Sequence, residues 1–297
     1  MKKMEKVTFL GPAGATFSHR AYTVLAERFG TPPTICDGPN ANYIETTANR
    51  NILPTIIEHN CFGAIAMETL AQGRIDDALE GFTRLLGMYR NNTECPFHII
   101  GSIQLEICFC LMARSGIGLM SVRKIIAHPK ALGACKKLIT TIDVPTLGIM
   151  SNGEAARMIA EDEEYAMCAA LAPRSAANKY GLDVLIDQCE DERAITTFFL
   201  IAPKTHPMVT QKRNRVLVVF SIPHIAGSLV RALLAFDKEE LNLIQIHSVH
   251  VGNHTYHFAA ELEVASNQVD SFRRALCEFE KHVDQYLSFG PFAVVSH

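Results

Sequence analysis

The chain has 297 residues, enough for two domains at the usual length of about 100–200 residues each. With 48% hydrophobic and 20% charged residues it has the composition of an ordinary globular protein. The net charge of -3 argues against a nucleic-acid binder, which would usually carry a basic patch. No apolar stretch is long enough for a membrane span or a signal peptide, and the nine cysteines form no CxxC pair. These features predict a cytoplasmic protein with reduced thiols.

Strand and helix signals alternate from the start of the chain, which is the pattern of an α/β fold. In the first part the expected elements are strand 6–11, helix 17–29, helix 50–59, strand 62–67, helix 73–86 and one or two strands over 97–112. Thr16 or Ser18 can cap the first of these helices.

A second alternating set follows. Its expected elements are strand 122–127, helix 129–139, strand 147–150, helix 152–161, strand 165–170, helix 173–180 and strands 184–187 and 195–202. Ser151 is expected to cap helix 152–161, and Gly181 to end helix 173–180.

The polar segment 203–214 contains two prolines and interrupts this pattern, so we interpret 205–214 as a linker. After it come strand 215–222, helix 227–236, strand 241–251, a turn at Gly252-Asn253, strand 254–264, helix 269–286 and strand 292–295. The order βαββαβ predicts a ferredoxin-like unit, an antiparallel sheet with both helices on one face.

Ligands of open α/β sheets bind beyond the carboxyl ends of the strands, where helix N-termini offer free N–H groups. Five segments of this chain fit that position. Their candidate residues are Gly14, Thr16, Ser18, Glu68, Thr69, His128, Lys130, Ser151, Asn152, Thr196, Thr197 and Phe198. Each turn alone is as consistent with a structural role as with a ligand site. The first loop is not a Walker loop, because no Gly-Lys-Ser/Thr follows it.

Taken in order, five segments resemble the successive motifs of prephenate dehydratases: FLGPAGATFSHRAY, AIAMETLAQG, AHPKALGAC, CAALAPRSAANKYGL and TTFFLIA. The segment that begins VLVVFSIPHIAGSL resembles the ACT domain that follows in those enzymes. The resemblance implies a two-lobed catalytic domain over 1–204, similar to type II periplasmic binding proteins. Lobe one would cover about 5–112 and 190–204 and lobe two about 113–189, with the ACT domain at 215–297.

The resemblance also implies an activity: a carbon–oxygen lyase of phenylalanine biosynthesis that converts prephenate to phenylpyruvate, water and carbon dioxide without a metal or an organic cofactor. Thr196 and Glu68 would be catalytic, and the other candidate residues would bind the anionic substrate. An amino-acid effector would bind the ACT domain at Gly227, Ser228, Leu229, His247 and Ser248. The resemblance further implies a homodimer or homotetramer, and neither nucleic acid nor membrane is an expected partner.

Several positions depart from the family motifs. Thr197 stands where the family has arginine, Thr69 and Ala134 where it has amides, and Ala127 where it has serine. Each hydrogen bond lost to a charged ligand group costs about 1.5–3 kcal/mol. Two alternatives therefore stay open: a lyase that decarboxylates prephenate without aromatisation, and a non-catalytic sensor of small anions.

Four histidines mark the predicted hairpin of the tail. Pairing across a two-residue turn would place position 250 opposite 255 and 248 opposite 257. His250 and His257 would then share one face, with His247 and His254 on the other. Because four ligands would not converge, we expect no metal site here.

Overall fold

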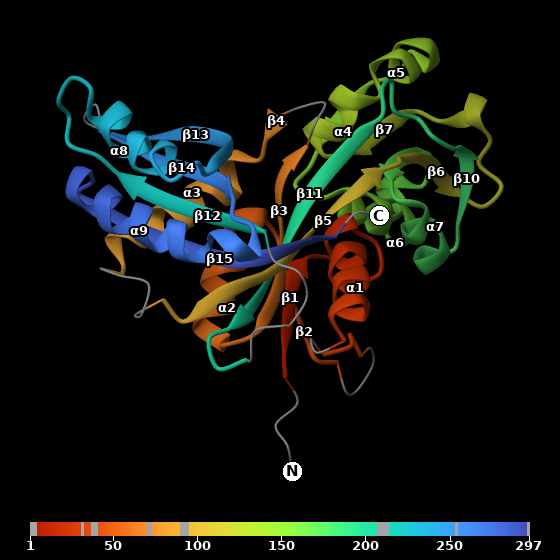
Figure 1. Cartoon of the computed structure of the whole chain (residues 1–297). Coiled ribbons are helices and arrows are strands. Elements are labelled where there is room, and N and C mark those ends of the chain that lie inside the picture. The colour runs from red at the N-terminus through yellow and green to blue at the C-terminus, as the bar shows by residue number, and fades with distance from the viewer. Residues whose placement is uncertain are drawn as a thin grey trace.

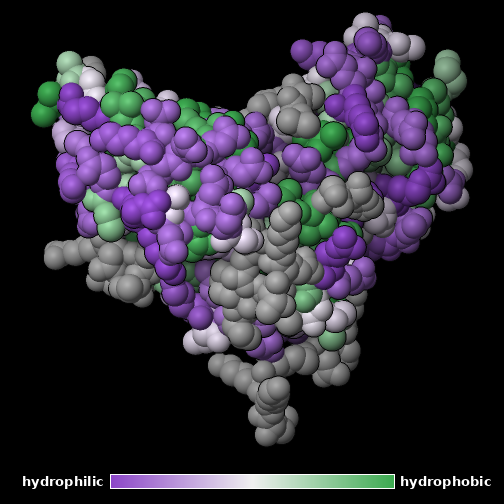
Figure 2. Space-filling view, in the orientation of Figure 1, coloured by the Kyte–Doolittle hydropathy of each residue, from purple (hydrophilic) through white to green (hydrophobic). Residues whose placement is uncertain are grey.

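The computed structural model describes residues 5–30, 33–36, 41–69, 73–89, 95–206, 214–252 and 255–295. Figure 1 shows three bodies: one at the bottom centre around β1 and α1, one at the upper right around β6 and β7, and one at the upper left around β12 and β13. None of the helices within these residues combines the length and the apolar character needed to span a membrane. On the face drawn in Figure 2, the coloured residues are mostly hydrophilic.

Lobe one is a mixed sheet in the order β5-β11-β3-β1-β2, covered by helices. Its elements are β1 (Val7–Leu10), α1 (Phe17–Phe29), β2 (Tyr43–Thr46), α2 (Ile52–His59), β3 (Phe62–Thr69), β4 (Gly73–Arg74), α3 (Asp76–Arg84), β5 (Phe97–Ile107) and β11 (Ala194–Pro203). Thr16 caps α1 as predicted, since its hydroxyl accepts a hydrogen bond from the His19 backbone N–H at 3.3 Å. The predicted helix 73–86 is shorter, because Gly73 and Arg74 pair with β3.

Lobe two is a five-stranded sheet in the order β10-β6-β9-β7-β8. Its elements are β6 (Cys110–Arg114), β7 (Lys124–Ala127), α4 (Pro129–Ala134), α5 (Lys136–Ile142), β8 (Thr146–Gly148), α6 (Asn152–Glu161), β9 (Cys168–Ala172), α7 (Arg174–Tyr180) and β10 (Leu182–Ile186). The predicted helix 129–139 is in fact two helices, because Cys135 leaves helical geometry at φ -117° and ψ 35°. Gly181 ends α7 in the left-handed conformation, as predicted.

The tail has the predicted order βαββαβ. Its elements are β12 (Arg215–Ser221), α8 (Ser228–Asp237), β13 (Asn242–Gly252), β14 (Thr255–Glu263), α9 (Val269–Phe279) and β15 (Gln285–Val295). The strands pair antiparallel in the order β13-β14-β12-β15, which is the ferredoxin-like order. The predicted helix 269–286 ends earlier, at Phe279, and the last strand starts at Gln285 rather than 292. Together with the two sheets, this arrangement confirms the predicted fold class.

The tail shares a sheet and a core with lobe one. The end of β15 pairs in parallel with β5, from Ala293 opposite Gly101 to Val295 opposite Ile103, and this makes one ten-stranded sheet of the two. Below that seam the rings of Phe97 and Phe289 stack at 5.5 Å. Burying such aromatic pairs is among the larger hydrophobic contributions to stability. The βαββαβ unit, which the sequence predicts as a separate domain, is therefore held against lobe one by a shared sheet and a shared core.

Candidate active site in the interlobe cleft

A cavity of about 380 Å³ lies between lobe one and lobe two. Most of its wall is apolar, and its polar residues come from strand ends and helix starts of both lobes. Those polar residues are Thr16, Ser18, Asn49, Thr69, Asp77, His128, Lys130, Ser151, Asn152 and Thr196. An apolar cavity with a few converging polar groups is the usual form of a small-molecule site.

Two buried threonine hydroxyls meet on the lobe-one wall of the cavity. Thr69 ends β3 and lies directly opposite Thr196 on β11, and their Oγ1 atoms are 2.8 Å apart. Whichever hydroxyl accepts this hydrogen bond keeps its own proton for a ligand. The pair is therefore an oriented donor in a site that is otherwise largely apolar.

Several helices begin at the cavity, among them α1, α4 and α6. At α1 and α6 the first N–H groups have no backbone partner within the helix and carry partial positive charge, so this part of the wall favours anions. Helix α4 contributes less, because Pro129 has no N–H and the Lys130 N–H donates to His128 Nδ1 at 3.2 Å. The side chain of Asn152 fixes two of these helix starts together, because its Oδ1 accepts a hydrogen bond from the His128 N–H at 2.8 Å. Carboxylates are the ligands that such a wall would bind.

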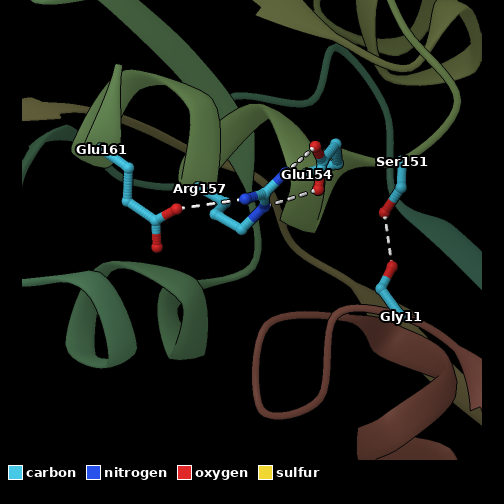
Figure 3. A network of polar contacts seen from close by, with 5 residues as sticks. All are labelled: Gly11, Ser151, Glu154, Arg157 and Glu161. Carbon is cyan, nitrogen blue, oxygen red and sulfur yellow. Dashed lines mark hydrogen bonds and ion pairs between the residues drawn. The ribbon is translucent and has the colours of Figure 1, made fainter. Parts of the chain in front are cut away.

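Ser151 occupies the N-cap position of α6, but its hydroxyl does not cap the helix. It donates to the carbonyl oxygen of Gly11 in lobe one at 2.9 Å, as Figure 3 shows. Ser151 therefore keeps the predicted N-cap position, but the predicted cap hydrogen bond is absent, because the hydroxyl is directed toward the Gly11 carbonyl of lobe one. Along the outer face of the same helix, Arg157 pairs with Glu154 and Glu161 (Figure 3).

Beside this bond the two lobes touch directly. A Cβ on Gly153 would lie 2.8 Å from the carbonyl oxygen of Ala15, so only glycine fits between α6 and the first loop. Lys179 of α7 donates to the carbonyl oxygen of Ala13 in the same loop. Gly14 gives that loop its left-handed turn at φ 72° and is not among the residues that line the cavity.

The charges of the cavity come from both lobes. Burial, followed by the charge of Lys130, lowers the pKa of His128, and the charge of Asp77 acts in the opposite direction. His128 is therefore neutral near pH 7. Asp77 lies at the limit of an ion pair with Arg50, at 4.0 Å. Among the described residues that line it, the cleft thus has one ammonium group, on Lys130, and one carboxylate, on Asp77.

Glu68 and Thr197, both predicted to act in the cleft, lie on the opposite face of the same strands. They line a second cavity of about 30 Å³, together with residues of the βαββαβ unit that include Gln245, His247 and Glu261. We call this space the junction cavity. Because successive side chains of a strand point to opposite faces, Thr196 and Phe198 face the cleft while Thr197 faces the junction. The structure therefore does not bring Glu68 to the cleft.

The junction cavity holds two carboxylates. Burial raises the pKa of Glu261, and the charge of Glu68 raises it further. Two contacts oppose these effects: Gln245 Nε2 donates to Glu261 at 2.9 Å, and Arg215 lies 3.8 Å from it. The desolvation of the carboxylate outweighs both contacts.

The register of the tail hairpin differs from the predicted one by a residue. His250 lies opposite Tyr256, and His257 opposite Val249, because the pairing is irregular between His250 and Gly252. His257 therefore shares a face with His247, toward lobe one, and its Nδ1 lies 3.2 Å from the Thr83 carbonyl oxygen. The fourth histidine of the prediction, His254, lies outside the described residues. Within those residues, no three His, Cys, Asp or Glu side chains gather as metal ligands would.

The five predicted regulatory residues do not form one group. Gly227, at φ 80°, precedes α8, and the hydroxyl of Ser228 accepts a hydrogen bond from Arg231 at 3.1 Å. Leu229 packs into the core beneath α8. Ser248 lies opposite Phe258 on the helix-covered face of the sheet, whereas His247 lines the junction cavity on the other face.

Sequence reasoning missed two polar residues of the cleft, Asn49 and Asp77. Asn49 supports the wall: its Nδ2 donates to the Ala66 carbonyl oxygen at 2.8 Å, and its Oδ1 accepts from the Ala66 N–H. Both residues stand at the start of a helix, a position where acidic and amide residues are common for local reasons. Because a local role already explains these residue types, no separate sequence signal showed that they line the cavity.

The family model described as prephenate dehydratase matches residues 7–206. A prephenate dehydratase of Corynebacterium glutamicum is 31% identical over 252 residues, which are 82% of this chain and 72% of that protein. Arogenate dehydratase/prephenate dehydratase 2 of Arabidopsis thaliana is 30% identical over 152 residues, 51% of this chain and 40% of the plant protein. The structure of a prephenate dehydratase from Arthrobacter aurescens in complex with L-Phe superposes with a TM-score of 0.75 at 23% identity, over 96% of this chain and 89% of that one.

Proposed function

Since this chain belongs to the prephenate dehydratase family, we propose that its interlobe cleft converts prephenate to phenylpyruvate, water and carbon dioxide. The protein would act as a carbon–oxygen lyase of phenylalanine biosynthesis. The observation that supports this best is the Thr69–Thr196 hydroxyl pair at 2.8 Å on the wall of the cleft.

The reaction needs a proton donor at the departing ring hydroxyl. The bond from the ring to its carboxylate breaks, carbon dioxide leaves, and the electron pair enters the ring as the bond to the hydroxyl breaks. The leaving oxygen takes a proton and becomes water, while aromatisation supplies the driving force. Thr196 is the donor in this scheme: Thr69 orients its hydroxyl, and solvent restores the proton.

The cleft also has groups for the two carboxylates of the substrate. The N-termini of α1 and α6 offer backbone N–H groups, and Lys130 offers an ammonium group. Holding the substrate at both carboxylates fixes the ring, so that both departures occur in one orientation.

The missing arginine at position 197 does not argue against activity. Thr197 faces the junction cavity, so a cation at this position would not line the cleft. The threonine at position 197 therefore leaves the charge of the cleft unaltered. This favours a dehydratase over the non-catalytic sensor.

One assay separates the three functions. The purified protein is incubated with prephenate, and both prephenate consumption and phenylpyruvate absorbance in alkali are followed. Phenylpyruvate formation that is abolished by Thr196→Val supports the dehydratase. Prephenate consumed without phenylpyruvate would indicate decarboxylation alone, and saturable calorimetric binding without consumption would indicate a sensor.

For the tail, we propose an ACT-type effector unit in a homodimer or homotetramer. Gly227 and Ser228 stand at the start of α8, where an amino-acid carboxylate could bind. His247 lines the junction cavity and is therefore not available to an effector at α8. We expect L-phenylalanine at millimolar concentration neither to inhibit the dehydratase activity nor to raise the melting temperature of the protein. Thermal shift with L-phenylalanine tests this, and light scattering after size exclusion tests the oligomeric state.

A further inference from the structure

His128 stands at the start of α4 and lines the cleft. Its imidazole ring caps the helix, because Nδ1 accepts a hydrogen bond from the backbone N–H of Lys130 at 3.2 Å. Serine, threonine, aspartate and asparagine are the usual caps, and they make this bond with a shorter side chain. The cap therefore accounts for Nδ1 only, and the second ring nitrogen, Nε2, lies on the far side of the ring.

The cap decides where the ring carries its proton. A nitrogen that accepts a hydrogen bond has no hydrogen of its own, so the neutral ring is protonated at Nε2. A second proton would have to bind at Nδ1, where it would face the N–H of Lys130 and break the cap. Burial, and then the ammonium of Lys130, also disfavour the imidazolium, whereas the carboxylate of Asp77 on α3 favours it. His128 is thus a neutral donor with one ring N–H.

Two helices of lobe two hold this residue in place. The backbone N–H of His128 donates to Oδ1 of Asn152, at the start of α6, at 2.8 Å. The ring of His128 is held by the first turn of its own helix, α4. Backbone and ring are therefore both fixed before a ligand binds, and such preorganisation makes a hydrogen-bond donor effective.

The proposed reaction makes different demands at the two carboxylates of the substrate. The pyruvyl carboxylate keeps its charge throughout, so a positive group beside it stabilises the substrate and the transition state alike. The ring carboxylate loses its charge as carbon dioxide forms, so a cation beside it would stabilise the substrate more and slow the reaction. A neutral donor can still hold the breaking bond perpendicular to the ring, where its electron pair enters the π system.

We propose that the Nε2–H of His128 binds and orients the carboxylate that leaves as carbon dioxide, and that the cap on α4 keeps this donor neutral. The proposal rests on the proposed dehydratase function and adds a residue of lobe two to the Thr69–Thr196 pair of lobe one. His128 neither gives nor takes a proton in this step. The bond from the ring to the carboxylate breaks, its electron pair enters the ring, and the N–H is left facing neutral carbon dioxide.

The first test compares His128→Asn and His128→Gln in steady-state kinetics with prephenate and in thermal unfolding. Asparagine keeps the cap but is too short to place a donor at Nε2, so kcat should fall about tenfold with the melting temperature unchanged. Glutamine gives up the cap but can place an amide N–H near Nε2, so kcat should stay within about threefold of the wild type. A role in capping alone would give the reverse: a stable, active asparagine variant and a less stable glutamine variant.

The second test follows kcat and KM between about pH 5 and pH 8, after subtraction of the rate without protein. In the wild type both should fall toward acid pH, because the imidazolium would bind the departing carboxylate too tightly. The glutamine variant does not titrate here and should lack this joint fall.

Two results would overturn the role of His128 and leave the dehydratase function in place. One is an asparagine variant as active as the wild type, or one whose loss glutamine does not restore. The other is a KM that falls at acid pH with kcat unchanged, which would place His128 at the carboxylate that stays. If the wild type consumes no prephenate, the dehydratase function itself fails, and this proposal fails with it.

Discussion

The two faces of strands β3 and β11 carry neighbouring residues of the same motifs into different surroundings. On the cleft face, Thr69 and Thr196 pair their hydroxyls in a cavity of about 380 Å³ beside several helix starts. On the other face, Glu68 and Thr197 meet the βαββαβ unit around a cavity of about 30 Å³, with room for only a few water molecules. The comparison teaches that a contiguous motif on a strand serves two surfaces, because alternate side chains point in opposite directions.

The largest expected effect on kcat distinguishes Thr196 from its neighbour Thr197. Thr196→Val should lower kcat about 100-fold or more with little change in KM, because the donor to the departing hydroxyl is lost. Thr197→Val, on the next residue and the opposite face, should change kcat less than threefold. Steady-state kinetics with prephenate measures both. Equal losses of kcat in the two variants would contradict the assignment of catalysis to the cleft face alone.

The second effect concerns closure of the cleft. Gly153→Ala would bring a methyl group to within 2.8 Å of the first loop, so it should lower the free energy of unfolding by about 1–3 kcal/mol and kcat/KM about tenfold. Gly133→Ala is the matched control, because a Cβ there meets no atom within 4 Å. At that exposed helix position alanine should stabilise slightly, by about 0.5–1 kcal/mol. Thermal unfolding and kinetics of both variants would reveal whether the lobes must touch at Gly153.

A third prediction concerns the pH dependence of the junction. The pKa of Glu261 is raised in the folded protein, so the folded state holds this proton to higher pH than the unfolded chain does. Stability should therefore fall as pH rises from the ordinary glutamate value to the raised one, and stay lower above it. Glu261→Gln removes this descending step and should be at least as stable as the wild type at pH 7. Denaturant unfolding at several pH values measures it, and an unchanged slope in the variant would contradict the burial argument.

The smallest effect is expected for Glu68→Gln. If Glu68 acts only at the junction, kcat should stay within about threefold of the wild type, whereas a catalytic carboxylate would cost at least about 100-fold. Removing its charge should also reduce the pH-dependent step attributed to Glu261, since Glu68 contributes to the raised pKa. A large loss of kcat with unchanged stability would instead show that Glu68 takes part in catalysis.

The sequence predicted most of the secondary structure because the local signals were strong. The cap at Thr16, the end of α7 at Gly181 and the order βαββαβ all depend on residues close in the chain. The misplaced boundaries have equally local causes: the break at Cys135 and the shifted hairpin register carry no distinct signal in residue type.

The candidate site was predicted only in part. The residues that line the cleft from helix starts and strand ends, such as Ser18, His128 and Asn152, were found because that position in an α/β fold is itself predictive. Asn49 and Asp77 were missed because an ordinary helix start explained them.

The sequence by itself determined the family, the α/β class and the residues that stand at strand ends, because these follow from motifs and local periodicity. Only the tertiary structure decided which side of β3 and β11 each residue serves and that Ser151 bonds Gly11 across the lobes. It also decided that the tail joins the sheet of lobe one through β15. These depend on contacts between segments far apart in the chain, and no local pattern records which distant surface a side chain will meet.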